Sequence, residues 1–225
     1  MPVLDRSHVD SLPLAIDDRH RDLPKGLAFR LRGAVGAAVV IAGASIVFWS
    51  FDPVPRSGSW SDIALDAMAW AMFLAGAIIR FWATLYIGGR KGRSLVTVGP
   101  YSLCRHPLYV GTFLIALSVA PFAHSVTFGV LVALGIAYYA YGTVAAEETS
   151  LRQIWGERFD AYCRDVPAFW PRLRNWRSPT SIEVNLQALA REARRASRWA
   201  WLPIAADIIA HVQLHPWCPA ILHLP

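Results

Sequence analysis

Long apolar runs constrain the fold of this chain more than any other feature of its sequence. They cover residues 31–51, 60–86, 108–123 and 125–146. A run of about 20 apolar residues is long enough to cross a bilayer as a helix, and short connections between runs are typical of antiparallel neighbours in a bundle. The sequence therefore predicts an all-α integral membrane protein with about four transmembrane helices.

The composition agrees with a membrane protein. Only 17% of the 225 residues are charged, whereas a soluble domain carries about 25%. The mean hydropathy is +0.34. The net charge of +6 comes from Lys and Arg clusters beside the apolar runs, and clusters so placed set membrane orientation more often than they bind nucleic acid. We therefore expect membrane lipids as neighbours and no nucleic-acid partner.

The basic residues also predict the topology. The loop 88–107 carries four of them, Arg90, Lys91, Arg93 and Arg105. The turns 52–59 and 121–125 hold only Arg56 between them. The positive-inside rule places the basic loop on the cytoplasmic side. Both termini and Glu147 then lie on that side too, and we expect the bacterial inner (plasma) membrane.

The chain divides into three parts on this interpretation. Residues 1–28 form a polar cytoplasmic segment, 29–170 the membrane-embedded core and 171–225 an interfacial, amphipathic extension. Residues 151–162, near the end of the core, have the pattern of one short amphipathic helix with aromatic anchors.

The C-terminal extension contains two further candidate segments. Residues 183–198 alternate leucines and alanines with arginines at helical spacing, which is typical of a helix lying on an anionic membrane surface. The apolar stretch 199–214 is interrupted by Pro203 and Asp207. These interruptions favour an interfacial or re-entrant segment, with a fifth spanning helix as the alternative.

The cysteines do not predict a cross-link or a metal centre. Cys104, Cys163 and Cys218 are odd in number and share no metal-ligand spacing. We expect neither a disulfide framework nor a bound metal. Acidic residues interrupt residues 1–25, so no signal peptide is predicted.

Polar and aromatic side chains gather where the third apolar run begins. Tyr101, Arg105 and His106 precede this run, and Tyr109 lies in its first turn. Pro107 suits the first position of a helix, which makes His106 the expected N-cap. A helix N-terminus attracts negative charge. Taken alone, these residues are also compatible with an ordinary cap and aromatic belt at a membrane interface.

A pair of acids is expected to face this helix start. Glu147 and Glu148 follow the fourth run, and in an antiparallel hairpin that end lies beside His106. A helix N-terminus binds a carboxylate, a glutamate binds an ammonium or a ribose diol, and tyrosine rings attract a sulfonium. The combination predicts a small zwitterionic ligand with cationic character.

Short motifs follow one another between residues 95 and 162. They are Leu95-Val96, Gly99-Pro100-Tyr101, Arg105-His106-Pro107-Leu108-Tyr109-Val110-Gly111, Glu147-Glu148-Thr149-Ser150-Leu151 and Phe159-Asp160-Ala161-Tyr162. Together they resemble the isoprenylcysteine carboxyl methyltransferase family and the related phospholipid methyltransferases, over about residues 60–170. The resemblance implies that S-adenosylmethionine binds between the cytoplasmic ends of the core helices, and that a lipid-like acceptor enters from the bilayer.

The resemblance also implies the residues of the site. Cofactor contacts are expected from Arg93, Ser94, Leu95, Val96, Tyr101, His106, Pro107, Leu108, Tyr109, Glu147 and Glu148. One position departs from the family. Four residues before the first glutamate, the isoprenylcysteine enzymes carry an arginine tied to substrate recognition, and Thr143 stands there in this chain. The pattern therefore favours the cofactor more than it favours a prenylcysteine substrate.

The predicted reaction is methyl transfer to an amphiphilic or other apolar acceptor. Attack on a sulfonium cancels charge, so a dry site and in-line positioning promote it. A carboxylate acceptor needs no base, whereas an amine or a thiol does, and His106 and Glu148 are the candidate catalytic groups. The alternatives are a phospholipid N-methyltransferase, a small-thiol methyltransferase, a membrane reductase using NADPH, and a non-enzymatic scaffold or permeation unit.

Overall fold

The computed structural model of the chain describes residues 50–51, 60–89, 94–122, 126–205, 208 and 222–223. The predicted N-terminal segment 1–28 and nearly all of the predicted first span, 31–51, lie outside the described residues.

The regular secondary structure of the described part of the chain is helical apart from one two-residue strand pair. Strands β1 (Ser50–Phe51) and β2 (Leu222–His223) are parallel, with Ser50 opposite Leu222 and Phe51 opposite His223. The helical elements are, in chain order, α2 (Trp60–Ile87), α3 (Pro100–Leu103), α4 (Pro107–Phe122), α5 (Val126–Tyr139), the π-helix η3 (Ala140–Val144), α6 (Ala145–Trp155), α7 (Glu157–Asp165), the 3-10 helix η4 (Leu173–Asn175) and α8 (Leu186–Trp199). The predicted all-helical class is thus confirmed for the described residues.

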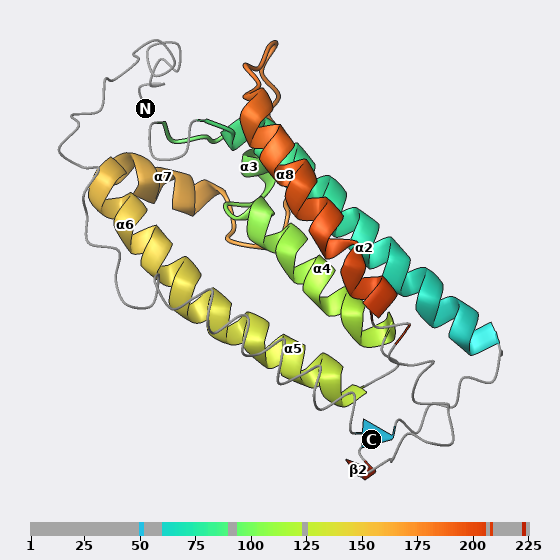
Figure 1. Ribbon diagram of the computed structural model, residues 1–225. Helices are drawn as coiled ribbons and strands as arrows, with labels where there is room; N and C mark the ends of the chain where they lie inside the picture. The colour runs from blue at the N-terminus through green and yellow to red at the C-terminus, as the bar shows by residue number, and fades with distance from the viewer. Residues whose placement is uncertain are drawn as a thin grey trace.

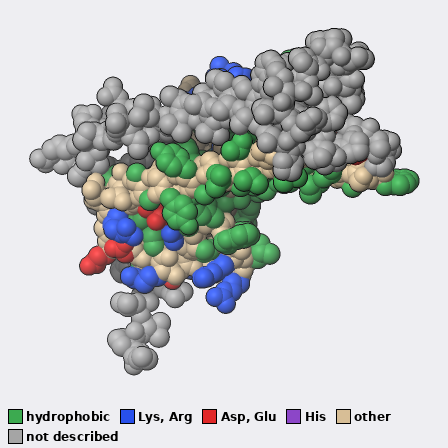
Figure 2. All heavy atoms as spheres, turned by 90° about the horizontal axis from the view of Figure 1, so that it is seen from below, with side chains coloured by type: hydrophobic (Ala, Val, Ile, Leu, Met, Phe, Trp, Pro, Cys, Tyr) green, Lys and Arg blue, Asp and Glu red, His purple; other side chains and the backbone are tan. Residues whose placement is uncertain are grey.

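Two helices in the described part of the chain are long and apolar enough to cross a membrane. They are α2 and the continuous helix 126–155, which comprises α5, η3 and α6, whereas the apolar helix α4 is shorter, at 16 residues. Large apolar side chains on these helices, such as Ile78 and Leu134, remain exposed. Hydrophobic side chains also cover much of the described surface in Figure 2, apart from a region where the charged side chains gather. This is the distribution expected for helices that face lipid.

Helices α2 and α4 form the most extensive contact between described elements, and they lie side by side in Figure 1. Glycines allow this approach: a Cβ on Gly76 would lie 2.6 Å from the carbonyl oxygen of Gly111, and the reverse distance is also 2.6 Å. Next to this crossing, Phe73 of α2 and Ile115 of α4 pack in one apolar cluster. Small residues at such a crossing are typical of helix pairs in membranes.

The helix predicted for residues 151–162 is two helices. Helix α6 ends at Trp155 and α7 begins at Glu157, with Gly156 between them at φ 51° and ψ −130°. Because only glycine adopts this conformation at little cost, the chain turns a corner there. The corner directs Phe159 and Tyr162 of α7 back toward the core.

Helix α8 forms where sequence periodicity predicts it, but one of its faces packs along α2. Glu192 of α8 is buried, and Trp199, Ala200 and Leu202 pack against the cluster that contains Phe73. Residues 201–205 are also helical. The extension is therefore part of the helix bundle over these residues, as Figure 1 shows for α8.

Candidate active site

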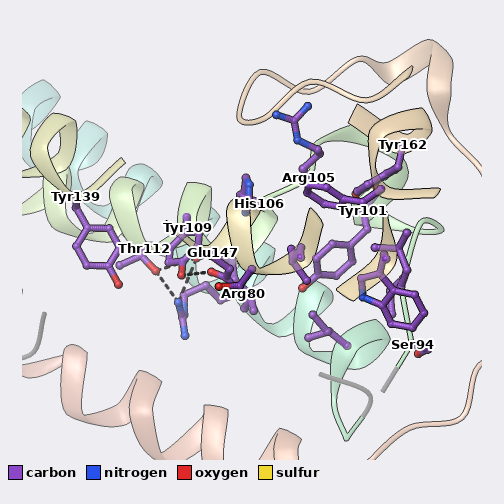
Figure 3. A pocket seen from close by; sticks show the side chains of 18 of the residues that line it. Arg80, Ser94, Tyr101, Arg105, His106, Tyr109, Thr112, Tyr139, Glu147 and Tyr162 are labelled. Carbon is purple, nitrogen blue, oxygen red and sulfur yellow. Dashed lines mark hydrogen bonds between the residues drawn. The ribbon is translucent and has the colours of Figure 1, made fainter. Parts of the chain in front are cut away.

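A cavity of about 570 Å³ is lined by residues of α2, α3, α4, α6, α7 and α8, together with Tyr139 at the end of α5. This volume falls within the range of about 300–1,000 Å³ that is typical of small-molecule sites. Figure 3 shows its labelled side chains converging from several elements, with Tyr109 and Glu147 near Arg80 and with Tyr101 beside Tyr162.

The loop before α4 is held by the segment that follows α7. Gly99 has a φ of +63°, and a Cβ there would lie 2.2 Å from the ring of Tyr86. Its amide donates to the carbonyl of Arg177 at 2.7 Å, while the Ser102 hydroxyl donates to the carbonyl of Gly99 at 2.7 Å. The hydroxyl of Tyr162 donates to the carbonyl of Tyr101 at 2.7 Å. These bonds fix the position of Tyr101 in the cavity wall.

Helix α4 begins at Pro107, as its sequence predicts, and the carbonyl of His106 accepts the amides of Tyr109 and Val110 at 3.0 Å each. The amide of His106 donates to the carbonyl of Ala168 at 3.1 Å. The helix start is therefore held between its own first turn and residues that follow α7.

Glu148 joins Arg105 and His106 through a single oxygen. Its Oε1 lies 2.8 Å from His106 Nε2, and it accepts from Arg105 Nε at 2.9 Å and pairs with Nη2 at 2.8 Å. Arg105 Nη1 also donates to the carbonyls of Val166 at 2.7 Å and Cys163 at 3.2 Å. Glu148 therefore connects the α4 start to the loop after α7, and it does not line the cavity.

Glu147 has a different place. Its side chain lines the cavity, and its Oε2 accepts a hydrogen bond from the Tyr109 hydroxyl at 2.5 Å. The Tyr109 ring lies 5.6 Å from the ring of Tyr139 in an edge-to-face arrangement. This wall therefore combines a carboxylate with two aromatic rings, which suits a ligand group with positive charge.

The π-helix η3 brings Tyr139 and Glu147 to the same cavity. In an uninterrupted α-helix, residues eight positions apart lie about 80° apart around the axis. The additional residue of a π turn takes up about 100°. The turn Ala140–Val144 lies between the two side chains, so both face inward. The apolar run alone predicted a helix that ends near residue 146, whereas the observed helix continues to Trp155.

Burial controls the protonation of two groups at this site. It raises the pKa of the Tyr101 hydroxyl well above its usual value, so this group remains a donor at neutral pH. It lowers the pKa of His106, although the hydrogen bond with Glu148 acts in the opposite direction. A neutral His106 donates from Nε2 to the Glu148 carboxylate, because an ionised carboxylate only accepts.

The hydroxyl of Tyr101 is buried in the cavity wall and has no hydrogen-bond partner within the described part of the chain. An unsatisfied buried donor costs about 1–3 kcal/mol. A polar ligand atom at this place would remove the cost. Tyr101 therefore marks a polar contact point on an otherwise largely apolar wall.

The structure brings most of the sequence-predicted residues to one cavity. Those that line it are Ser94, Leu95, Val96, Tyr101, His106, Leu108, Tyr109 and Glu147. Pro107 is buried at the start of α4 behind them, and Thr143 lies in η3 away from the lining. Arg93 lies outside the described residues.

The lining also contains residues that were not among the cofactor contacts expected from the sequence. Five of them stand in the motifs quoted above: Arg105, Ser150, Leu151, Phe159 and Tyr162. The others are Arg80, Ile87, Thr112, Tyr139, Trp155, Arg195 and Trp199. Arg80 had a signal, since a charge inside an apolar run is a functional candidate. Arg195 and Trp199 had none, because only the docking of α8 on α2 brings them there.

Metal-binding groups are not assembled among the described residues. No three His, Cys, Asp or Glu side chains in this part of the chain are arranged to hold an ion. Cys104 and Cys163 are free thiols, and burial raises the pKa of Cys104 to about 11.

Helices that are long and apolar enough to cross a membrane thus lie beside a cavity whose acidic and aromatic side chains suit a small molecule. The comparisons with known proteins identify the class further. A sequence model of the isoprenylcysteine carboxyl methyltransferase (ICMT) family matches residues 63–153. The chain belongs to this family, whose members are integral membrane proteins.

Several relatives are similar over much of the chain. It is 32% identical to the nickel-cobalt-cadmium resistance protein NccN of Alcaligenes xylosoxydans xylosoxydans, over 74% of this chain and 79% of that protein. It is 31% identical to the cobalt-zinc-cadmium resistance protein CzcN of Cupriavidus metallidurans, over 82% of this chain and 81% of that protein. The mouse protein-S-isoprenylcysteine O-methyltransferase is 32% identical over 46% of this chain and 36% of its own length. No solved structure matches the chain.

Proposed function

We propose that this protein transfers a methyl group from S-adenosylmethionine to an amphiphilic acceptor. The observation that carries the proposal is the shared cavity: the residues expected to contact the cofactor from three separate motifs meet there. Membership of the ICMT family supports the same reaction. When bound, the cofactor supplies an electrophilic methyl group on a positively charged sulfur.

The cavity fits this cofactor chemically. Glu147 offers a carboxylate to an ammonium or to a ribose diol. The rings of Tyr109 and Tyr139 suit a sulfonium, and the unpartnered hydroxyl of Tyr101 offers a donor to a heterocycle or a carboxylate. We propose these residues, with Ser94 and the main chain around it, as the cofactor site.

We propose His106 as the base when the acceptor is an amine or a thiol. Burial keeps its imidazole neutral at pH 7. Because Nε2 lies 2.8 Å from the Glu148 carboxylate, Nδ1 is the ring nitrogen that can take a proton. Glu148 then acts by fixing the orientation and tautomer of His106. A carboxylate acceptor would need neither group as a base.

The acceptor that we propose is a lipid-like molecule that reaches the cavity from the bilayer. The mouse relative is named for an isoprenylcysteine substrate, which favours a prenylated thiol or carboxylate. Phospholipid amines and small apolar thiols are the alternatives within the same chemistry. Incubation of purified protein with labelled cofactor and a membrane lipid extract, followed by identification of the labelled product, distinguishes them.

Binding of S-adenosylhomocysteine to detergent-purified protein tests the proposal directly. We expect Glu147→Ala to weaken this binding by more than tenfold, roughly the loss of one charge-assisted hydrogen bond. Glu157→Ala is the matched control, because Glu157 is an exposed acid on α7 outside the cavity. No binding to the unaltered protein at millimolar ligand would refute the proposal, and binding of NADPH in its place would favour a reductase.

We further propose a four-span topology in the bacterial inner membrane, with both termini and the cavity on the cytoplasmic side. The charge of the loop 88–107 supports this orientation. Reporter fusions at both termini and in the 52–59 turn test it. A periplasmic signal from either terminus contradicts it.

The names of two relatives favour a cellular role in resistance to metal ions such as cobalt and cadmium. We propose that the methyl transfer itself contributes to this resistance. In a strain that lacks the gene, the unaltered protein should restore growth on Co²⁺ and Cd²⁺, and Glu147→Ala should not. Equal restoration by both would separate the resistance from methyl transfer.

A further inference from the structure

Helix α8 lies outside the stretch 63–153 that matches the ICMT family, yet it completes the wall of the cavity. Arg195 and Trp199 of this helix line the cavity together with residues of α2 and α4. Figure 1 shows α8 running alongside α2 over much of its length. The stretch that matches the family therefore does not include the side of the cavity that α8 forms.

Three charged side chains join α8 to α2 at this wall. Glu192 is only 3% exposed, and Arg80 is 8% exposed. Arg80 donates to the two carboxylate oxygens of Glu192 from Nε at 2.6 Å and from Nη2 at 3.1 Å. Arg195 Nη1 donates to Glu192 Oε2 at 2.7 Å. Two guanidinium groups thus share one carboxylate, and the group carries one excess positive charge.

Arg80 makes its hydrogen bonds to neighbouring groups of the protein. Besides Glu192, its Nη1 donates to the carbonyl of Leu108 at 3.1 Å and to the Thr112 hydroxyl at 2.5 Å. Its guanidinium carbon also lies 4.5 Å from the centre of the Trp199 ring. Arg80 therefore anchors α8 and contributes little further hydrogen bonding to the cavity.

Arg195 is placed differently. Its side chain is 45% exposed and lines the cavity, and the contact with Glu192 uses Nη1. A guanidinium has five N–H donors in a planar fork, and two of them match the two oxygens of a carboxylate. Glu192 holds the arginine in position, while the excess charge of the group attracts an anion.

We propose that Arg195 binds the carboxylate of a ligand in this cavity. The inference rests on the proposed methyl transfer, for which two ligands could supply the carboxylate: the amino-acid end of the cofactor and an anionic acceptor. Glu147, which lines the same cavity, takes the positive charge of the cofactor. The cavity then has an acidic wall from the family motifs and a basic wall from α8.

The experiment measures binding of three probes to purified full-length protein. They are S-adenosylhomocysteine, its decarboxylated analogue, and N-acetyl-S-farnesylcysteine as an apolar carboxylate. Arg195→Gln should weaken binding of at least one carboxylate probe roughly tenfold or more and leave the decarboxylated analogue unchanged. Arg195→Lys, which keeps the charge without the fork, should lose less affinity. Arg194→Gln, next to it on the exposed surface of α8, is the matched control.

The pattern of losses identifies the source of the carboxylate. Weaker S-adenosylhomocysteine binding assigns Arg195 to the cofactor, and weaker farnesylcysteine binding alone assigns it to the acceptor. The proposal is overturned if both carboxylate probes stay within twofold of the unaltered protein, if the decarboxylated analogue weakens equally, or if no carboxylate probe binds. A separate outcome, the absence of S-adenosylhomocysteine binding to the unaltered protein, refutes the proposed methyl transfer.

Discussion

Replacing Glu192 by glutamine should strongly destabilise the helix bundle. Arg80 and Glu192 are 8% and 3% exposed, and their closest contact is 2.6 Å. Removing one partner of a buried ion pair leaves an uncompensated charge and costs about 3–5 kcal/mol. Since about 1 kcal/mol lowers the melting temperature of a chain of this size by roughly 2–4 °C, Glu192→Gln should lower it by about 6–20 °C.

The melting temperature can be followed in detergent with a dye that fluoresces on reaction with thiols. Cys104 is only 5% exposed, so unfolding releases its thiol to the dye. Asp160→Asn is the matched control, because Asp160 forms an ion pair with Arg152 at 2.6 Å in which the two side chains are 42% and 51% exposed. Exposed pairs of this kind contribute little to stability, and the control should melt close to the unaltered protein.

A double variant separates the charge from the packing. Arg80→Met with Glu192→Leu removes both charges and retains apolar volume, so most of the lost stability should return. If Glu192→Gln melted within about 2 °C of the unaltered protein, α8 would not be docked on α2 through this pair. A double variant as unstable as the single one would refute the unpaired charge as the cause.

Three further predictions concern single positions near the cavity. Because burial lowers the pKa of His106, the unfolded chain binds a proton at a higher pH than the folded protein does. The stability should therefore fall as the pH drops below about 6.5. Melting curves from pH 8 to pH 5 should show a smaller loss of melting temperature for His106→Asn than for the unaltered protein. Burial raises the pKa of Cys104 to about 11, so about one Cys104 thiol in a thousand is ionised at pH 8. Mass spectrometry should find Cys104 unlabelled by iodoacetamide until the protein unfolds. Rapid labelling of Cys104 in the folded protein would contradict its burial. Deleting Gly142 from the π turn should rotate Tyr139 by about 100° relative to Glu147 and weaken S-adenosylhomocysteine binding, whereas Gly142→Ala, whose added Cβ meets nothing within 4 Å, should bind normally.

Local signals predicted some helix boundaries closely. Helix α4 begins at Pro107, as a proline at the first helical position indicates. Helix α2, Trp60–Ile87, matches the apolar run 60–86. These boundaries could be predicted because a proline or a change from polar to apolar residues acts on the chain locally.

Other boundaries differed because hydropathy and helicity are separate properties. The apolar run ends near residue 146, but the helix continues to Trp155, since nothing in Glu147-Glu148-Thr149 interrupts a backbone hydrogen-bond ladder. Residues 151–162 have helical periodicity throughout, yet Gly156 adopts a positive φ and divides them. Periodicity does not reveal which glycine turns the chain.

The sequence by itself determined the helical class and one half of the site, in which the motifs around His106 and Glu147 lie close together. The motifs around His106 and Glu147 carry their residue types in a fixed order, and an antiparallel hairpin brings those ends together whatever the rest of the chain does. Only the tertiary structure decided the other half. Glu192 stands among arginines on a polar helix and would be expected in solvent, but its pairing with Arg80, 112 positions away in the chain, buries it and carries Arg195 to the cavity. A charge buried by a distant partner has no local signature, because its burial is favourable only when both helices are already in contact.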